Sequence, residues 1–463
     1  MQSLLRAGHD LAAVHLAQPL YLASRLARPR HRAAARAARE GLRFRAAARG
    51  WTADRRRAWV LDALRAAVRH AYAHTPYYRA LLDEMGWDPR ADFGFDDYAR
   101  LPVLERGTVR ERAAELRALA LDGLREDSTG GSGGEPTRVW RGPRELGWGE
   151  SAGASFMRRI GVPPATSTGL LWGHHLDPVA SDAWMDRARD WVDHVRWLDC
   201  LRMSPAVLRA HHAALQRWRP ACVVAYAGAL GALAEHVLAS GDTPRYPGRC
   251  FVTGAEKLHP HHREAVAHAF ARPVHERYGS RDAGLIGFQV DPEHTLDFEV
   301  DWANLLVEPE TVGARASLLV TKLHADGMPM LRYRVGDIAR FPAESRPGHP
   351  CFMLHEVVGR EADRLWLPGG GWMDGLGFPH LLKDFPVREF QVAQARDLDV
   401  VVRVVPLPGF TAEAAERIRG LVMANLPGVA VSVQAVDEIA HTRAGKSRPV
   451  TSEADVPARR GAA

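Results

Sequence analysis

The sequence predicts an α/β protein: a large N-terminal domain of β-sheets flanked by helices, followed by a small C-terminal α+β domain. Its 463 residues are about three times the common domain size, which leaves room for two domains. Hydrophobic residues make up 46% and charged residues 25%, values typical of globular chains. Beyond a glycine-rich segment at 128–134, short apolar runs alternate with helical stretches, and this alternation favours the α/β class.

The N-terminal part is predicted to be helical. Residues 1–50 are rich in Arg and Ala and form a predicted helical extension ahead of the large domain. From residue 52 to 124 apolar residues recur at helical spacing, and Asp54 is the expected N-cap. The recurring apolar positions are Trp59, Leu61, Leu64, Val68 and Tyr72.

Strand and helix patterns then define the two domains. Strands are predicted at 169–172, 221–225, 249–253 and 317–321, and helices at 206–218 and 228–239. A boundary is expected near 359–363, so the large domain spans 51–360 and the small, mobile domain spans 361–463. Within the small domain, residues 400–405, 412–425 and 429–433 predict strand, helix and strand.

Charge and cysteine content exclude several classes. The net charge is +6, but the basic residues are spread along the chain, so no nucleic-acid partner is expected. The densest basic group, at 25–57, is interpreted as a solvated helical face, with a nucleic-acid or lipid patch as the alternative. Four cysteines without a CxxC pair indicate neither a disulfide framework nor a zinc site, and favour a reducing, cytoplasmic location. No targeting signal or transmembrane segment is expected, because the apolar run at 11–24 is short and interrupted.

Lysine is rare in this chain. Only four of the 61 basic residues are lysines, at positions 257, 322, 383 and 446. Arginine has been used almost wherever a cation was needed. Each remaining lysine therefore raises the question of whether a compact ammonium group is required there.

A glycine-rich loop at 128–137 is a candidate phosphate-binding segment. Its glycines allow backbone amides to approach an anion closely, and its hydroxyls add donors. It is neither a Walker A sequence nor a dinucleotide fingerprint, because GKS/GKT and GxGxxG are both absent. A flexible linker is the alternative interpretation. The donor residues are Ser128, Thr129, Gly130, Gly131, Ser132, Gly133 and Gly134.

Five further motifs follow this loop in a fixed order. They are FVTGAEK at 251–257, YGSRDAG at 278–284, LRYRVGD at 331–337, GREAD at 359–363 and TRAGK at 442–446. Together with the loop they resemble the acyl-adenylate-forming superfamily. The likeness is greatest to its phenylacetate-CoA ligase-like branch, which includes capsular polysaccharide biosynthesis proteins, and it extends over roughly residues 70–446.

The resemblance implies a site for ATP. The loop would hold the phosphates, Tyr278 would stack on adenine, and Asp337 would accept hydrogen bonds from the ribose hydroxyls. Asp282 stands where the family places an acidic magnesium ligand, although Glu is usual there and Arg281 replaces a common Thr. Further residues implied at the nucleotide site are Gly254, Ala255, Glu256, Gly279, Ser280 and the junction arginine Arg360.

Catalysis is assigned by the same resemblance to Lys446, whose ammonium group would bridge the carboxylate and the α-phosphate. Ala362 occupies the hinge position, where Asp is common; small residues also serve as hinges, so rotation of the small domain is expected about this position. Trp172, His174 and His175 are candidate acyl-pocket residues.

The predicted function is ATP- and Mg²⁺-dependent adenylation of a carboxylic acid, with release of pyrophosphate and transfer of the acyl group to a thiol. Coenzyme A is the expected acceptor, and a homodimer is the expected assembly. Three alternatives remain open: a ligase that passes the group to an amine or activates a non-carboxylate oxyanion, a degenerate nucleotide-binding homologue, and a basic nucleic-acid or membrane-surface protein.

Overall fold

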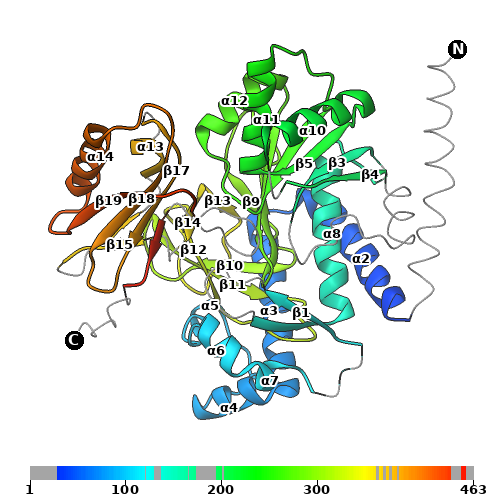
Figure 1. The fold of residues 1–463 in the computed structure, drawn as a ribbon. Helices are drawn as coiled ribbons and strands as arrows, with labels where there is room; N and C mark the ends of the chain where they lie inside the picture. The colour runs from blue at the N-terminus through cyan, green and yellow to red at the C-terminus, as the bar shows by residue number, and fades with distance from the viewer. Residues whose placement is uncertain are drawn as a thin grey trace, which may run out of the picture. The chain divides into compact units, whose positions relative to one another are not determined.

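The computed structural model describes residues 29–119, 121, 123–129, 137–164, 166–173, 194–200, 203–360, 364–368, 372–374, 378–382, 385–439 and 450–454. The chain divides into two compact units (Figure 1). The first comprises residues up to Val335 and Ala339–Val357, and the second comprises Gly336–Ile338 and the chain from Val358 onward. The boundary therefore falls inside two strands, β12 (Tyr333–Arg340) and β14 (Glu356–Arg360).

An eight-stranded mixed sheet forms the centre of the first unit, with the strand order β13-β9-β8-β7-β6-β5-β3-β4. Strands β4, β3, β5, β6 and β7 run parallel, whereas β8, β9 and β13 extend the sheet in antiparallel fashion. The strands are β3 (Thr168–Leu171), β4 (Val195–Leu198), β5 (Cys222–Tyr226), β6 (Cys250–Gly254), β7 (Val274–Ser280), β8 (Gly284–Phe288), β9 (Phe298–Val300) and β13 (Met353–Leu354).

Helices cover both faces of this sheet. The helices α10 (Pro205–Trp218), α11 (Ala227–Ser240) and α12 (Pro260–Phe270) pack on one face, where Val223, Ala225 and Phe251 point into their core. On the other face Phe156 of α8 (Pro143–Arg159) meets the alternate residues Val224 and Val252. Because successive strand residues face opposite sides, strands buried on both faces are largely apolar, as β5 is and as β6 is apart from Thr253.

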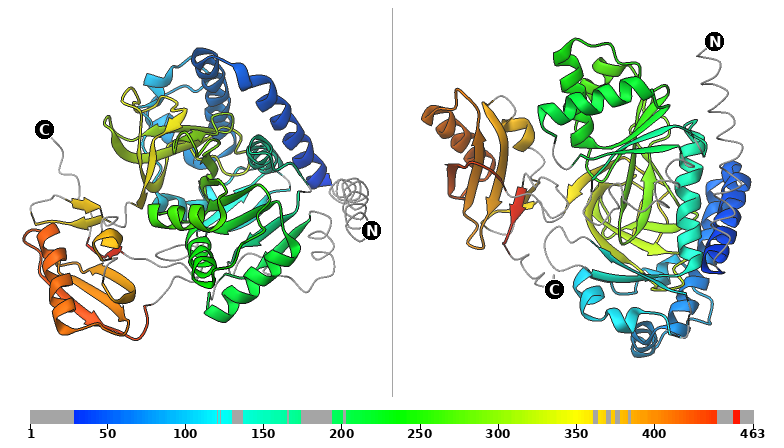
Figure 2. Two further views of the ribbon diagram at one scale, coloured as in Figure 1. Left: turned by 90° about the horizontal axis from the view of Figure 1, so that it is seen from above. Right: turned by 45° about the vertical axis from the view of Figure 1, so that its right-hand side comes forward.

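The N-terminal helices pack against this framework. Helix α2 (Pro29–Ala47) runs along α8 (Figure 2), and Arg45 reaches Asp301 in a buried ion pair at 2.8 Å. Helix α3 (Ala53–His74) begins at Thr52, whose side chain accepts a hydrogen bond from the amide of Arg55. The expected Asp54 cap is therefore wrong, because Thr52 has the extended backbone of an N-cap and Asp54 lies inside the first turn. Shorter helices follow: α4 (Pro76–Glu84), α5 (Phe95–Tyr98), α6 (Arg106–Glu111) and α7 (Ala113–Leu116).

The first unit also contains a hairpin and most of a four-stranded sheet. The sheet has the order β10-β11-β12-β14, built from β10 (Leu305–Pro309), β11 (Arg315–Lys322), β12 (Tyr333–Arg340) and β14 (Glu356–Arg360). Its apolar residues share one core with helices α3 to α7. The hairpin pairs β1 (Arg125–Thr129) with β2 (Thr137–Arg141) in antiparallel register.

The second unit has its own sheet, with the order β19-β18-β17-β20. Ile418 and Val422 of α14 (Ala412–Asn425) pack onto Val402 and Val404 of β18. The other elements are β15 (Arg364–Trp366), β16 (Trp372–Asp374), α13 (Phe378–Leu382), β17 (Val387–Gln394), β18 (Val400–Pro406), β19 (Val431–Ala435) and β20 (Val450–Ser452).

The predicted α/β class is confirmed, with strands and helices close to the positions that the apolar runs indicated. For example, the strand expected at 221–225 is Cys222–Tyr226, and the helix expected at 412–425 is Ala412–Asn425. Among the described residues, no helix is both long enough and apolar enough to cross a bilayer.

Candidate active site

The hairpin β1–β2 carries the glycine-rich loop. Ser128 and Thr129 end β1, and Thr129 pairs with Thr137 at the start of β2, so the loop is closed by these two threonines. Gly130, Gly131, Ser132, Gly133 and Gly134 lie outside the described residues. The structure thus defines where the predicted phosphate loop leaves and rejoins the fold.

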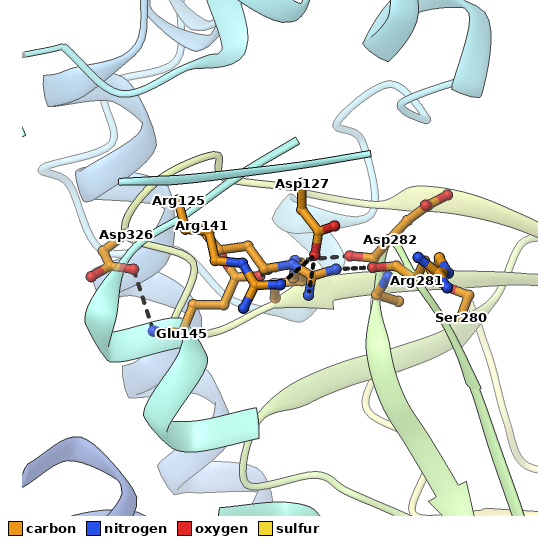
Figure 3. Close-up of polar contacts among 10 residues, drawn as sticks. Arg125, Asp127, Arg141, Glu145, Ser280, Arg281, Asp282 and Asp326 are labelled. Atoms are coloured by element: carbon orange, nitrogen blue, oxygen red, sulfur yellow. Dashed lines mark hydrogen bonds and ion pairs between the residues drawn. The ribbon is translucent and has the colours of Figure 1, made fainter. Parts of the chain in front are cut away.

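Arg141, at the end of β2, ties this hairpin to the Ser280–Asp282 turn (Figure 3). Its guanidinium donates a hydrogen bond to the carbonyl oxygen of Arg281 and lies 3.2 Å from Asp127 Oδ2. The two bonded residues are 140 positions apart in the sequence. Two of the predicted nucleotide-binding segments therefore meet in the fold, through a side chain that no motif had identified.

Asp282 lies at the centre of this junction. Its side chain is buried, and Oδ2 accepts a hydrogen bond of 2.7 Å from the hydroxyl of Tyr333 on β12. Its backbone carbonyl accepts one of 2.9 Å from Lys322 Nζ on β11. A buried carboxylate held by a hydroxyl and a backbone anchored by an ammonium together fix the position of this predicted magnesium ligand.

Lys322 also forms a buried ion pair with Glu145 of α8. Arg141 Nε lies 3.6 Å from the same oxygen, Glu145 Oε1, while Glu145 Oε2 is buried without a hydrogen-bond partner among the described residues. One carboxylate therefore sits between two cations that both reach the 281–282 backbone. The rarity of lysine drew attention to Lys322, but the sequence offered no partner for it.

The beginning of α8 is fixed from the same side. The carboxylate of Asp326 accepts hydrogen bonds from the amides of Arg144 and Glu145, at 3.0 and 3.3 Å. A side chain at Gly142 would collide with Asp326, since a Cβ there would lie 2.2 Å from its carboxylate carbon. An acidic group at a helix N-terminus satisfies amides that have no partner within the helix, so Asp326 holds Glu145 in place.

The Gly254–Glu256 turn follows β6 and adjoins the start of the YGSRD motif, because β6 pairs with β7. Ala255 has a φ of 68°, a left-handed conformation that marks a sharp turn. Glu256 Oε2 accepts a 3.1 Å hydrogen bond from the amide of Gly228 in the first turn of α11. The carboxylate of Glu256 therefore anchors the turn to a helix N-terminus, which sequence reasoning had not anticipated.

Tyr278 and its neighbours form a tight bend at the end of β7. The ring of Tyr278 packs edge-on to Phe298, with centroids 6.3 Å apart, and the β7–β8 register shifts between Tyr278 and Gly279. A Cβ on Gly279 would lie 2.4 Å from the carbonyl oxygen of Gly284, so only glycine fits there. The hydroxyl of Ser280 accepts a hydrogen bond from the amide of Ala283 and closes the turn that presents Asp282.

Asp337 and Arg360 both belong to the second unit and form an ion pair there. Arg360 Nε lies 3.0 Å from Asp337 Oδ1, and Asp337 is buried whereas the side chain of Arg360 is 42% exposed. The structure brings together these two predicted nucleotide-site residues. The partner of each had not been expected from the sequence.

Of the remaining candidates, Trp172 is described and packs against Tyr226, with ring centroids 4.2 Å apart and ring planes tilted by 55°. His174, His175, Lys446 and the hinge residue Ala362 lie outside the described residues.

A magnesium ion is implied by the resemblance. Among the described residues, no group of three His, Cys, Asp or Glu side chains is arranged to hold a metal by itself. Magnesium usually takes one or two protein carboxylates and completes its coordination with water and substrate phosphates. The carboxylate of Asp282, beside the hairpin that carries the glycine-rich loop, therefore fits a magnesium ion that arrives with ATP.

Several known proteins resemble this chain in sequence or in fold. No family model matches the sequence. The chain is 24% identical over 334 residues to a phenylacetate-coenzyme A ligase of Thermus thermophilus, covering 68% of this chain and 73% of the relative. It is 22% identical to the enzyme of the same name from Pseudomonas putida, with the same coverage.

Among solved structures, the fold matches that of 2-hydroxyisobutyryl-CoA ligase. The postadenylation state of that enzyme, in complex with R3-HIB-AMP, superposes with a TM-score of 0.64 at 18% identity, covering 87% of this chain and 90% of the other. An open conformation in complex with 2-HIB-AMP and CoA gives a TM-score of 0.55. In its ordered motifs, its curated relatives and its fold, this chain is similar to acyl-adenylate-forming enzymes, and the curated relatives that it matches in sequence are phenylacetate-coenzyme A ligases.

Proposed function

We propose that this protein is an AMP-forming ligase that adenylates a carboxylic acid with ATP, releases pyrophosphate, and transfers the acyl group to the thiol of coenzyme A. The observation that carries the proposal is the junction at Arg141, where the hairpin bearing the glycine-rich loop is bonded to the turn that presents Asp282. Through this bond the hairpin that carries the loop is joined to the turn of a buried carboxylate suited to magnesium, which supports a phosphate and magnesium site there.

Each predicted residue has a task in this reaction. The loop from Ser128 to Gly134 would donate hydrogen bonds to the phosphates, and Asp282 would hold magnesium, which neutralises phosphate charge. Tyr278 would stack on adenine beside the Gly254–Glu256 turn. Asp337, paired with Arg360, would accept from the ribose hydroxyls through its remaining acceptor capacity.

Lys446 would supply the charge that the first step needs. As the carboxylate oxygen attacks the α-phosphorus, negative charge grows on the phosphate oxygens and pyrophosphate leaves. An ammonium group placed there stabilises the transition state more than the ground state. This role rests on the motif at 442–446 and on the rarity of lysine in the chain.

The acceptor is assigned to coenzyme A because the curated relatives are named phenylacetate-coenzyme A ligases and the solved neighbour is a CoA ligase. We also propose that the second unit changes orientation between the two steps, about a junction at 359–363. Ala362→Pro would restrict the backbone there by fixing φ near roughly −65°. It should impair the complete reaction to thioester more than pyrophosphate exchange.

A cytoplasmic location and a homodimer stay predictions. All four cysteines are free and buried, which suits a reducing compartment. Size-exclusion chromatography with light scattering would determine the oligomeric state.

The function is tested with purified protein, ATP, magnesium and a panel of carboxylic acids. Acid-dependent release of pyrophosphate, with AMP as co-product, is the expected result, and addition of coenzyme A should give the thioester. Formation of an amide instead, when amines replace the thiol, would favour the amine-acceptor alternative. ATP binding without pyrophosphate release, for any acid tested, would favour the degenerate nucleotide-binding homologue.

A further inference from the structure

Arg277 stands in a row of residues at the carboxyl ends of four neighbouring parallel strands. Leu171 pairs with Ala225, Tyr226 with Gly254, and Thr253 with Glu276. The next position along each strand completes one row across the sheet, and side chains in one row of a parallel sheet face the same side. The row consists of Trp172, Tyr226, Gly254 and Arg277.

The side chain of Arg277 lies across the glycine of this row. A Cβ on Gly254 would be 3.0 Å from Arg277 Cγ and 3.1 Å from its Nε, so the absence of a side chain there opens the path. The guanidinium carbon reaches a point 5.3 Å from the centre of the Trp172 ring, which itself packs on Tyr226. Arg277 therefore points along the row toward β3, away from the Ser280–Asp282 turn that follows its own strand.

Arg277 has no counter-ion among the residues that the structure describes. Within the part of the chain that the structure describes, no carboxylate pairs with this half-buried side chain and no hydrogen bond from its guanidinium is present. The buried arginines Arg45 and Arg332, in contrast, pair with Asp301 and Glu308. Burial lowers the pKa of Arg277 from its usual value. An arginine kept partly out of water without a partner is costly unless a ligand supplies the anion.

The location indicates which ligand that is. In α/β sheets, ligands bind at the carboxyl ends of the parallel strands. Trp172 was already a candidate acyl-pocket residue, and the guanidinium is directed to it rather than to the turn expected to handle the phosphates. The planar fork of an arginine, backed by an aromatic face, suits a carboxylate bound by two parallel hydrogen bonds.

We propose that Arg277 binds a second carboxylate on the acid substrate, so that this enzyme activates dicarboxylic acids with an apolar or aromatic body between the two carboxyl groups. The inference rests on the proposed function and names the substrate class for the same site. One carboxylate of the substrate would be adenylated. The other would be held by the guanidinium of Arg277 near Trp172. Trp172 and Tyr226 would contact the part of the substrate between the two carboxylates.

The experiment compares matched pairs of acids: phenylacetate with 4-carboxyphenylacetate, benzoate with terephthalate, and hexanoate with adipate. Pyrophosphate release gives kcat/KM for each, and thermal stabilisation in the presence of a nonhydrolysable ATP analogue reports binding without turnover. Wild-type protein should prefer the diacid of at least one pair. Arg277→Ala should lower kcat/KM for that diacid by roughly 10- to 100-fold and leave the monoacid nearly unchanged.

Two further variants guard against misinterpretation. Arg277→Lys keeps the charge but not the planar fork, and should retain part of the preference if Arg277→Ala fails to fold. Arg196→Ala is the matched control, because Arg196 also lies over a tryptophan, Trp218, at 4.8 Å, on strand β4 of the same sheet. It should not alter the preference.

A wild-type preference for the monoacids, in both turnover and binding, would overturn the proposal. So would an equal loss for both acids of a pair in Arg277→Ala, since that would place Arg277 at the reacting carboxylate or the nucleotide. An absence of pyrophosphate release with every acid would count against the proposed function instead. In that case the thermal stabilisation by diacids, with and without Arg277, still decides the assignment of Arg277.

Discussion

The hydroxyl of Tyr333 donates a 2.7 Å hydrogen bond to the carboxylate of Asp282, and this bond joins two motifs that lie 51 residues apart. Asp282 belongs to the YGSRD motif, and Tyr333 belongs to the segment that ends in Asp337. The same carboxylate is the predicted magnesium ligand. The orientation of this predicted ligand therefore depends on a tyrosine to which sequence reasoning assigned no role.

Tyr333→Phe should weaken the response to magnesium. A partner that orients a metal ligand typically contributes 10- to 100-fold to metal affinity, so the magnesium concentration for half-maximal pyrophosphate release should rise by roughly 10-fold. The control is Tyr98→Phe, which removes another buried tyrosine hydrogen bond, to Thr321, at a distance of 2.5 Å. If the two variants depend on magnesium concentration in the same way, Tyr333 has no specific role in orienting the magnesium ligand.

The buried pair of Lys322 and Glu145 should matter for stability. Lys322→Met leaves the Glu145 carboxylate buried with only Arg141 nearby, and breaking such a pair from one side usually costs about 3–5 kcal/mol. The double variant with Glu145→Leu should recover a large part of this loss, because no uncompensated charge remains. Urea unfolding of the three proteins measures both effects. A loss below about 1 kcal/mol in the single variant would show that the pair is not a structural anchor.

Asp337 and Arg360 should affect ATP binding unequally. Asp337→Ala removes the acceptor proposed for two ribose hydroxyls, each hydrogen bond to a charged group being worth about 1.5–3 kcal/mol. Arg360→Ala removes only the cation that holds Asp337 Oδ1 at 3.0 Å, so its effect should be smaller. Calorimetric titration with ATP gives both values. An unchanged affinity of Asp337→Ala for ATP would show that Asp337 does not bind the ribose hydroxyls.

Acid should destabilise the protein through His324. Burial lowers the pKa of His324 to about 3; its ring stacks on Trp148 and contacts the carbonyl oxygen of Ala303 at 3.1 Å. Below about pH 6.5 this histidine is protonated in the unfolded chain but stays neutral in the folded protein. The free energy of unfolding therefore decreases as the pH falls toward 3. The slope from this group is roughly 1 kcal/mol per pH unit. In the His324→Gln variant the free energy of unfolding should decrease less steeply between about pH 6 and pH 4, as measured by denaturant unfolding at several pH values in that range. An unchanged slope would mean that other groups cause it.

Much of the fold could be predicted because its central strands are short apolar runs that alternate with helices. The strands that contain Val223 and Phe251 are buried on both faces, and burial on both faces favours apolar residues at successive positions. They are therefore recognisable in the sequence as apolar runs. The motifs likewise assigned Asp282 and the Gly254–Glu256 turn to one nucleotide site, and the strands that precede them, β7 and β6, are neighbours in the sheet. These features depend on local sequence and on the order of elements.

The connections between motifs could not be predicted in this way. Arg141 and Arg281 are 140 residues apart, and Lys322 and Glu145 are 177 apart, so no local pattern relates them. A ligand-binding role for Arg277 could not be predicted either. An arginine indicates such a role only once the structure shows that the described residues provide no counter-ion for it. In a chain with so many arginines, partners are decided by the tertiary fold.

The central claim, that this chain activates a carboxylic acid as its adenylate, is tested most directly by acid-dependent cleavage of ATP in wild-type protein and in Lys446→Ala. The wild type should release pyrophosphate and AMP only when the right acid is present. Lys446→Ala should remain folded and bind ATP, but should lose roughly 10²-fold or more in rate, as expected for an ammonium aimed at transition-state charge. Formation of ADP and phosphate, or full pyrophosphate release by Lys446→Ala, would contradict the account.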